Sequence, residues 1–411
     1  MSQSPRSGAR KEIVFADTLS VLLPLEEQVY LLKACLQPGN LGMRAWQIWQ
    51  EKVGDVLAGL QSKDQGGRSL IPLLARALRN NQIEIDPKVR SHLHRVVLYE
   101  ELRALVYQQI LRQIVTVLSV GGIDYLALKG AMLSATVYVD WSLRHNHDID
   151  LLLHQEDLKK AMTLLEEHSF SRTSDSNRLH ASSIKLVHHS GLSVELHGRL
   201  FRIPYYRAPL HQIWTRKTPA NINGTALNTL APADALMHVC GQAACSRSRD
   251  SLLWVCDAWH LLQSGKVEWD ISLATALASR LELPLAIQFD FLKNEMQAPI
   301  PEDVLNRLIS AAQMSPRLAQ EAALLGARLG RNGSIRNVLR QAPAWKTKAT
   351  LLIWMLLPSP DAMRWTEDVR SVWRLPLLYI ARPIRFVMRH LLLCARLLLQ
   401  RLKLHRYRSI L

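Results

Sequence analysis

The sequence contains little cysteine and no paired arrangement of it. Five cysteines occur among 411 residues, and no two of them form a C-x-x-C pair. A disulfide framework or a zinc ribbon needs cysteines in sets at characteristic spacings, so both are excluded. The scattered cysteines indicate reduced thiols in a cytoplasmic protein.

Long apolar runs are also missing. No stretch reaches the roughly 18 consecutive apolar residues that a membrane-spanning helix requires. The first twelve residues are polar and basic, and Asp17 and Pro24 interrupt the apolar positions behind them, so we expect no secretory signal. We therefore expect a protein of the cytoplasm, either soluble or peripheral at the inner face of the membrane.

Acidic residues are scarcer than basic ones. The chain has 35 Asp and Glu against 51 Lys and Arg, which gives a net charge of +16. Such an excess favours an anionic partner, which can be a nucleotide, a nucleic acid or an acidic membrane surface. Aromatic residues make up only 6% and are not interleaved with the basic ones, so nucleic acid is the less favoured partner.

The shortage of acidic residues is greatest at the C-terminus, where none follows Asp368 but ten Lys or Arg do. Five of them fall near one face of a predicted helix: Arg382, Arg385, Arg389, Arg396 and Lys403. A helix that packs on its domain and exposes a solvated basic side is the first interpretation. The alternative is an amphipathic helix attracted to an anionic membrane surface, and nucleic-acid binding is less favoured than either.

The period of the apolar residues changes along the chain and divides it into five parts. The clearest amphipathic helix spans residues 92–120 and ends at Gly121-Gly122. Short strand patterns follow, and helical spacing returns beyond Pro232. The expected parts are a polar tail (1–15), an N-terminal helical region (16–120), a small α/β unit (121–230), a helical domain (231–335) and a basic amphipathic C-terminal region (336–411).

Within residues 121–230 the pattern predicts both strands and helices. Gly130 permits a tight turn into a helix that runs from Ala131 to about Tyr138. A glycine and a serine separate two β-rich segments farther along, which predicts a hairpin. The expected strands cover residues 123–128, 148–153, 183–188 and 192–197.

Asp148 and Asp150 precede a run of leucines and carry the chemistry of this unit. An Asp-x-Asp pattern on a strand places both carboxylates on one face, roughly 6.5 to 7 Å apart along the strand. Apolar neighbours would partly bury them, and burial of unpaired carboxylates is very costly. A shared divalent cation removes most of that cost, and oxygen ligands of this kind suit Mg²⁺ or Mn²⁺. The pattern predicts a metal site.

Several short motifs occur together in a fixed order: Leu128-Lys129-Gly130, Tyr138, Arg144, Asp148-Ile149-Asp150 and Val194-Glu195-Leu196-His197. Together they resemble the bacterial nucleotidyltransferase-like proteins of the DNA polymerase beta superfamily. The group with an L-K-G, R-x-x-x-D-x-D and E-L-H pattern is the most similar. A weaker likeness continues through Leu230 to Asp234 and through Trp254 to Asp257. The order and spacing make the resemblance more specific than Asp-x-Asp alone.

The resemblance implies an α+β fold with a small mixed-sheet nucleotidyltransferase core between helical regions. It also implies that Asp148, Asp150 and Glu195 hold two Mg²⁺ (or Mn²⁺) ions and that Glu195 helps to orient or deprotonate an acceptor hydroxyl. The donor would be an NTP, and the acceptor a sugar or small metabolite. A non-catalytic nucleotide-binding or membrane-surface adaptor that keeps the fold is the alternative, and an RNA-binding transferase is a third.

The turn departs from the wider superfamily, because it reads Lys129-Gly130-Ala131 where Gly-Ser is usual. Backbone amides at the start of the helix still form an anion site, and Lys129 can supply charge in place of the serine. Arg144 is a candidate second phosphate contact. His197 is grouped with these nucleotide-binding residues, although a structural hydrogen bond is the commoner role for such a histidine.

Each candidate also has a plainer interpretation. Asp148 and Asp150 can cap a helix or bind Arg144, and Glu195 and Lys129 can be ordinary exposed residues. His145 and His147 are more readily solvated loop residues than transition-metal ligands. Asp257 is expected to be a helix-packing residue outside the site.

Overall fold

The computed structural model describes residues 22–62, 66–172, 183–201, 205–245 and 252–316, together with 376–381 and a few single positions between 318 and 384. The chain divides into two compact units: residues 1–177 with 183–341, and residues 178–182 with 342–411. All labelled elements belong to the first unit. Both the expected polar tail and nearly all of the expected basic C-terminal helix lie outside the described residues.

A seven-stranded mixed sheet forms the centre of the first unit, with the strand order β3-β4-β5-β2-β1-β7-β6. The strands are β1 (Tyr125–Ala127), β2 (Asp148–Leu153), β3 (Phe170–Arg172), β4 (Ser183–His188), β5 (Ser193–His197), β6 (Thr218–Ile222) and β7 (Thr225–Thr229). The central strand β2 runs antiparallel to β1 and parallel to β5. The sheet and its surrounding helices confirm the predicted α+β class with a mixed sheet.

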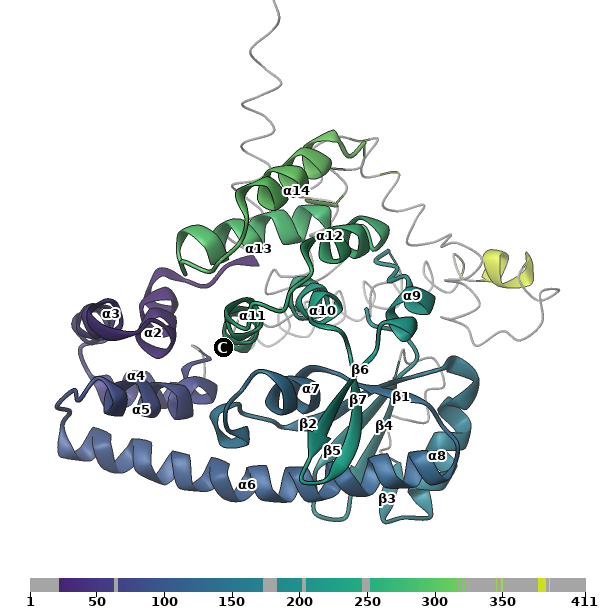
Figure 1. The fold of residues 1–411 in the computed structure, drawn as a ribbon, viewed down its shortest axis with the longest axis horizontal. Helices are drawn as coiled ribbons and strands as arrows, with labels where there is room; N and C mark the ends of the chain where they lie inside the picture. The colour runs from purple at the N-terminus through teal and green to yellow at the C-terminus, as the bar shows by residue number, and fades with distance from the viewer. Residues whose placement is uncertain are drawn as a thin grey trace, which may run out of the picture. The chain divides into compact units, whose positions relative to one another are not determined.

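Helices surround this sheet (Figure 1). They are α2 (Glu26–Leu36), α3 (Gly39–Val53), α4 (Val56–Gln61), α5 (Ile71–Asn80), α6 (Pro87–Val120), α7 (Lys129–Thr136), α8 (Leu158–Glu166), α9 (Leu210–Thr215), α10 (Pro232–Cys245), α11 (Leu253–Gln263), α12 (Trp269–Ala278), α13 (Glu282–Asn294) and α14 (Glu302–Met314). Short 3₁₀ turns occur at Gly67–Leu70 (η1), Trp141–Leu143 (η2) and Gln155–Asp157 (η3). Figure 1 shows α6 along one side of the sheet and α10 to α14 on the other.

Helix α6 begins earlier than the apolar period suggested. Asp86 accepts hydrogen bonds from the amides of Lys88 and Val89, and Pro87 occupies the first helical position. Both features favour a helix start, because the aspartate caps free amides and proline needs no amide partner there. The helix therefore has 34 residues and extends beyond the sheet toward α5.

Three strands were not anticipated: β3, β6 and β7. Strands β6 and β7 form an antiparallel hairpin closed by Asn223-Gly224. Both turn residues have positive φ, at 48° and 89°. This is the conformation that an Asn-Gly turn adopts between strands, so the dipeptide was the available signal. The β4–β5 hairpin was predicted and is present.

No helix within the described ranges is long and apolar enough to cross a bilayer. Four of the five cysteines are described, and all four are buried free thiols: Cys35, Cys240, Cys245 and Cys256.

Candidate active site

Strands β2 and β5 bring the expected carboxylates together. In their parallel register Asp150 lies directly opposite Glu195, and Asp148 lies opposite Ser193. Side chains two residues apart on a strand share a face, so His197 joins Glu195 on the face that carries Asp148 and Asp150. The two aspartates lie within the strand, and neither caps a helix.

Asp150 is the most buried of these four residues, because only 1% of its side chain is exposed. Its Oδ1 atom accepts a hydrogen bond from Nζ of Lys129 at 2.7 Å and lies 2.7 Å from Nε2 of His197. Its Oδ2 atom is buried and has no hydrogen-bond partner. A buried carboxylate oxygen without a partner is costly, so this atom is suited to a cation.

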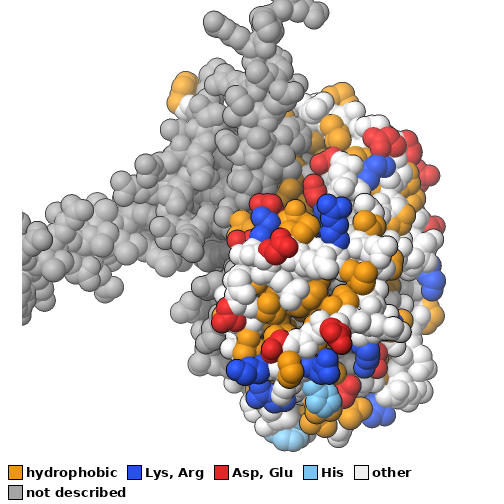
Figure 2. Space-filling view, turned by 90° about the vertical axis from the view of Figure 1, so that its left-hand side faces the viewer, with side chains coloured by type: hydrophobic (Ala, Val, Ile, Leu, Met, Phe, Trp, Pro, Cys, Tyr) orange, Lys and Arg blue, Asp and Glu red, His pale blue; other side chains and the backbone are white. Residues whose placement is uncertain are grey.

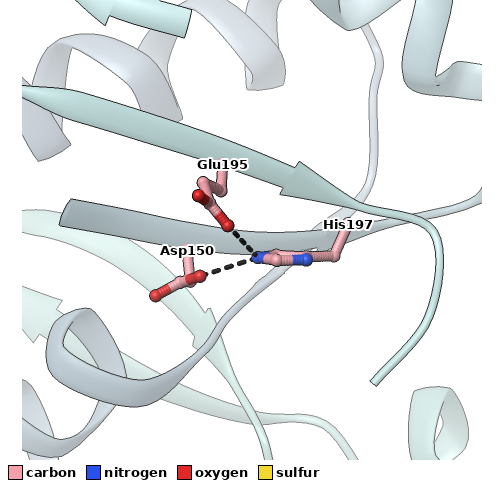
Figure 3. A group of neighbouring side chains, drawn as sticks. All are labelled: Asp150, Glu195 and His197. Atoms are coloured by element: carbon pink, nitrogen blue, oxygen red, sulfur yellow. Dashed lines mark hydrogen bonds and ion pairs between the residues drawn. The ribbon is translucent and has the colours of Figure 1, made fainter. Parts of the chain in front are cut away.

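Asp150, Glu195 and His197 form a group whose ligand atoms all lie within 4.8 Å of one another. In Figure 3 both carboxylates point toward the same nitrogen of the imidazole, and Oε2 of Glu195 is 3.7 Å from it. Among the described residues, this is the group suited to a metal ion. This group contains His197, for which the sequence predicted a role in nucleotide binding. It does not include Asp148, which was predicted as a metal ligand.

Asp148 and Asp150 differ in their electrostatic surroundings. Burial raises the pKa of the Asp148 carboxyl, and the negative charge of Asp150 adds to that effect. Burial would also raise the pKa of Asp150, but Lys129 and His197 hold it well below its ordinary value. Asp150 is thus the fixed anion of the site, whereas Asp148 takes up a proton more readily.

The turn between β1 and α7 has an unusual backbone. Lys129 is the residue with positive φ, at 42°, and Gly130 lies outside that region. A Cβ atom on Gly130 would overlap Oδ1 of Asn146 and lie 2.6 Å from Nη1 of Arg144. The glycine is therefore required for close packing against the next loop. The tight turn expected at Gly130 has its positive φ at Lys129, where α7 begins, two residues before the expected helix start.

Arg144 is engaged within the protein. Its Nε and Nη2 atoms donate to the two oxygens of Asp257 on α11, each at 2.8 Å, and Nη1 donates to Oδ1 of Asn146 at 2.7 Å. The hydroxyl of Tyr138 donates to the same Asp257 carboxylate. The guanidinium therefore does not bind Asp148 or Asp150, and Asp257 anchors the loop that leads to them.

The loop before β2 is held by residues that the sequence did not single out. Arg103 on α6 donates from Nε to the carbonyl of Asn146 at 2.8 Å, and the Asn146 amide donates to Ser134 on α7. The buried Tyr107 donates its hydroxyl proton to the carbonyl of Asp148 at 3.0 Å. These contacts fix the position from which Asp148 and Asp150 project. His145 pairs with Glu100 and His147 is exposed, and neither belongs to the metal-type group.

His238 on α10 is a further residue that sequence reasoning missed. It is fully buried, and neither ring nitrogen has a hydrogen-bond partner. Burial lowers its pKa to about 3, and the positive charge of Lys129 contributes in the same direction. The site therefore borders on a neutral imidazole. The only sequence signal was a histidine within an apolar helix, which does not distinguish this residue from core packing.

The comparisons with known proteins identify the family. A family model described as an uncharacterised nucleotidyltransferase matches residues 68–294, more than half of the chain. The chain belongs to this family. The match contains the whole sheet and every candidate residue from Lys129 to Asp257, and it confirms the resemblance at the level of the nucleotidyltransferase family.

A solved structure is also similar to part of this chain. It is an antigenic nucleotidyltransferase-like protein from Paracoccidioides brasiliensis, 21% identical, with a TM-score of 0.33. The similarity covers 49% of this chain and 96% of the other. No curated protein matches the chain.

Proposed function

We propose that the protein transfers a nucleoside monophosphate from an NTP to a hydroxyl acceptor, such as a sugar or small metabolite, with the help of a divalent metal. One observation carries this proposal. The buried Asp150 has an unpartnered oxygen and lies beside Glu195 and His197 on a face shared with Asp148. Membership of the nucleotidyltransferase family supports the transfer of a nucleotide.

The residues fit a divalent cation. Asp150 and Glu195 offer oxygen ligands, His197 can add a nitrogen, and Asp148 is close by on the same face. Carboxylate oxygens suit Mg²⁺ or Mn²⁺, and imidazole is a ligand that Mn²⁺ accepts more readily than Mg²⁺. When bound, such ions neutralise charge on the leaving pyrophosphate and help to activate the attacking oxygen.

The protein's own groups then have separate tasks in the transfer. The acceptor hydroxyl oxygen forms a bond to the α-phosphorus, the bond from that phosphorus to the bridging oxygen breaks, and pyrophosphate leaves. Glu195, half-buried at the edge of the site, takes the hydroxyl proton. Until its Nε2 atom serves as a metal ligand, His197 holds Asp150 in place through the bond to Oδ1. A positioned base of this kind contributes about 10²- to 10⁴-fold to a rate.

The turn at Lys129-Gly130 is the proposed triphosphate contact. Helix α7 begins at Lys129, whose side chain contacts Asp150, so the free backbone amides of its first turn lie beside the site. Such a helix start favours an anion. The Lys129 ammonium can bind phosphate when a metal ion takes over as the partner of Asp150. Arg144 acts in this scheme through its loop, because its guanidinium already binds Asp257 and Asn146.

The decisive experiment measures pyrophosphate release from each of the four NTPs with Mg²⁺ or Mn²⁺, with a cell extract as the source of acceptors. We expect release with one preferred NTP. The double variant Asp148→Asn/Asp150→Asn should lose it by about 10²-fold or more, the cost of removing preorganised electrostatic groups.

The matched control is Asp303→Asn, which removes an exposed carboxylate from α14. It should leave release unchanged. Nucleotide binding without metal-dependent release in the wild type would reject the transferase in favour of a non-catalytic nucleotide-binding protein.

A further inference from the structure

A cavity of about 940 Å³ lies against the N-terminal half of α6, outside the candidate active site. Its walls come from that helix, the end of α4, the η1 turn and the loop before β2. Cavities of roughly 300 to 1,000 Å³ are the size that small ligands occupy. Figure 2 shows this end of the molecule, where Lys, Arg and His side chains gather on the lower part of the face.

The lining of the cavity is strongly basic. Three arginines contribute to it, namely Arg68, Arg95 and Arg103, and Glu100 is the single acidic lining residue. That glutamate is already paired with His145 at 2.8 Å. In the part of the chain that the structure describes, no ion pair involves Arg68 or Arg95.

A second observation concerns how closely the positive charges lie together. His92 lines the same cavity, at its position on α6. Burial and the positive charges of Arg95 and Arg68 lower the pKa of His92, so both guanidinium groups lie close to this imidazole. Positive charges gathered at one cavity favour an anionic ligand.

The cavity adjoins the loop that carries Asp148. Two of its lining residues, Arg103 and His145, belong to the contacts that hold that loop. Tyr107, one helical turn beyond Arg103 on α6, binds the carbonyl of Asp148. A ligand held here is therefore next to the start of β2, from which the catalytic carboxylates project.

We infer that this cavity binds the phosphate group of a phosphorylated small molecule, which is the acceptor of the proposed nucleotidyl transfer. A phosphate monoester carries about −1.5 to −2 charges near pH 7, which matches several arginines better than a single carboxylate does. The volume of this half-open cavity fits a small molecule, whereas a polymer needs an extended groove. The role as acceptor rests on the proposed function, but the phosphate site does not.

The first test titrates the full-length protein with inorganic phosphate in the absence of divalent metal. We expect saturable binding of one phosphate, weakened roughly tenfold or more in Arg68→Gln/Arg95→Gln, because each charge-assisted hydrogen bond contributes about that factor. Arg44→Gln/Arg90→Gln removes two exposed arginines away from the cavity and should bind as the wild type does. Asp150→Asn should not weaken binding, which separates this site from the nucleotide site.

Equal weakening in both double variants, or no saturable binding, would overturn the inference. A single-stranded RNA that competes through the same arginines with steep salt dependence would also overturn it, since the ligand would then be a nucleic acid. Circular dichroism checks that the variants fold.

The second test uses labelled NTP with the small-molecule fraction of a cell extract, before and after phosphatase treatment. We expect Arg68→Gln/Arg95→Gln to require about tenfold more extract for half-maximal product at unchanged NTP affinity, and phosphatase to remove the acceptor. Unchanged product after phosphatase would overturn the acceptor assignment. If the wild type makes no product, the proposed function fails, while phosphate binding still tests the cavity.

Discussion

Nζ of Lys129 lies 2.7 Å from Oδ1 of Asp150, and this ion pair joins the turn after β1 to the central strand β2. The two carboxylates Asp150 and Asp148 raise the pKa of Lys129 despite its partial burial, so the ammonium is the counter-charge of the site. The same turn has positive φ at a residue other than glycine, a conformation that costs of order 1 to 3 kcal/mol. Backbone strain of this kind is found at functional sites, where the surrounding structure holds a side chain in one position.

Lys129→Met should weaken NTP binding in the presence of Mg²⁺ by roughly tenfold, because it removes one charge-assisted contact to phosphate. Isothermal titration calorimetry measures this directly. Lys129→Arg keeps the charge and should retain much of the affinity. Unchanged affinity in Lys129→Met would mean that the ammonium only balances Asp150.

His197→Gln should weaken Mn²⁺ binding by about 10- to 100-fold, the effect expected when a ligand or the residue that orients it is lost. Electron paramagnetic resonance of Mn²⁺ reports both the affinity and the loss of a nitrogen ligand. His189→Gln, on the turn between β4 and β5, is the matched control. An unaltered Mn²⁺ spectrum in His197→Gln would show that this histidine hydrogen-bonds to Asp150 and does not bind the metal ion.

Arg144→Met should destabilise the protein by about 3 to 5 kcal/mol, because it leaves the carboxylate of Asp257 buried without its charged partner. Urea unfolding measures the loss. The double variant Arg144→Met/Asp257→Leu should recover a large part of it, since no unpaired charge then remains. Additive losses in the double variant would contradict this account.

Gly130→Ala should cost about 1 to 3 kcal/mol by overpacking against Asn146 and Arg144. The double variant Gly130→Ala/Asn146→Ala relieves the closest overlap, so its loss should be smaller than the sum of the two single losses. Thermal or urea unfolding of the four proteins in this cycle provides the comparison.

His238 predicts a pH dependence of stability. Its pKa is about 3 in the folded protein, below the ordinary value of 6.5, so the unfolded chain binds a proton that the folded chain does not. The free energy of unfolding therefore falls as the pH drops below about 6.5 and continues to fall toward pH 3. By pH 4 the loss reaches about 3 kcal/mol from this residue. His238→Leu should remove this part of the pH-dependent loss, which urea unfolding at pH 7 and at pH 4.5 measures. An equal fall in the free energy of unfolding between the two pH values in the wild type and the variant would contradict this account.

Local sequence patterns were sufficient for most of the elements that carry the site. The leucines after Asp150 mark β2 as a buried central strand, and the Ser190-Gly191 turn gives the β4–β5 hairpin. Alternation along these strands places Glu195 and His197 on a common face without any tertiary information. The β6–β7 hairpin was missed although Asn223-Gly224 indicated a turn, because its strands contain Pro219, Asn221 and Asn228, which are residue types depleted in strands.

The sequence by itself determined the class of fold, the strand with its two aspartates and the candidate carboxylates, because these depend on neighbours along the chain. Only the tertiary structure decided that Arg144 binds Asp257, 113 residues away, and that His238 borders on Asp150. It also decided that Gly130 makes room for Asn146, and that α6 forms the wall of a basic cavity. Each of these depends on which helices pack together, and no periodicity or motif encodes the distance between side chains far apart in the chain.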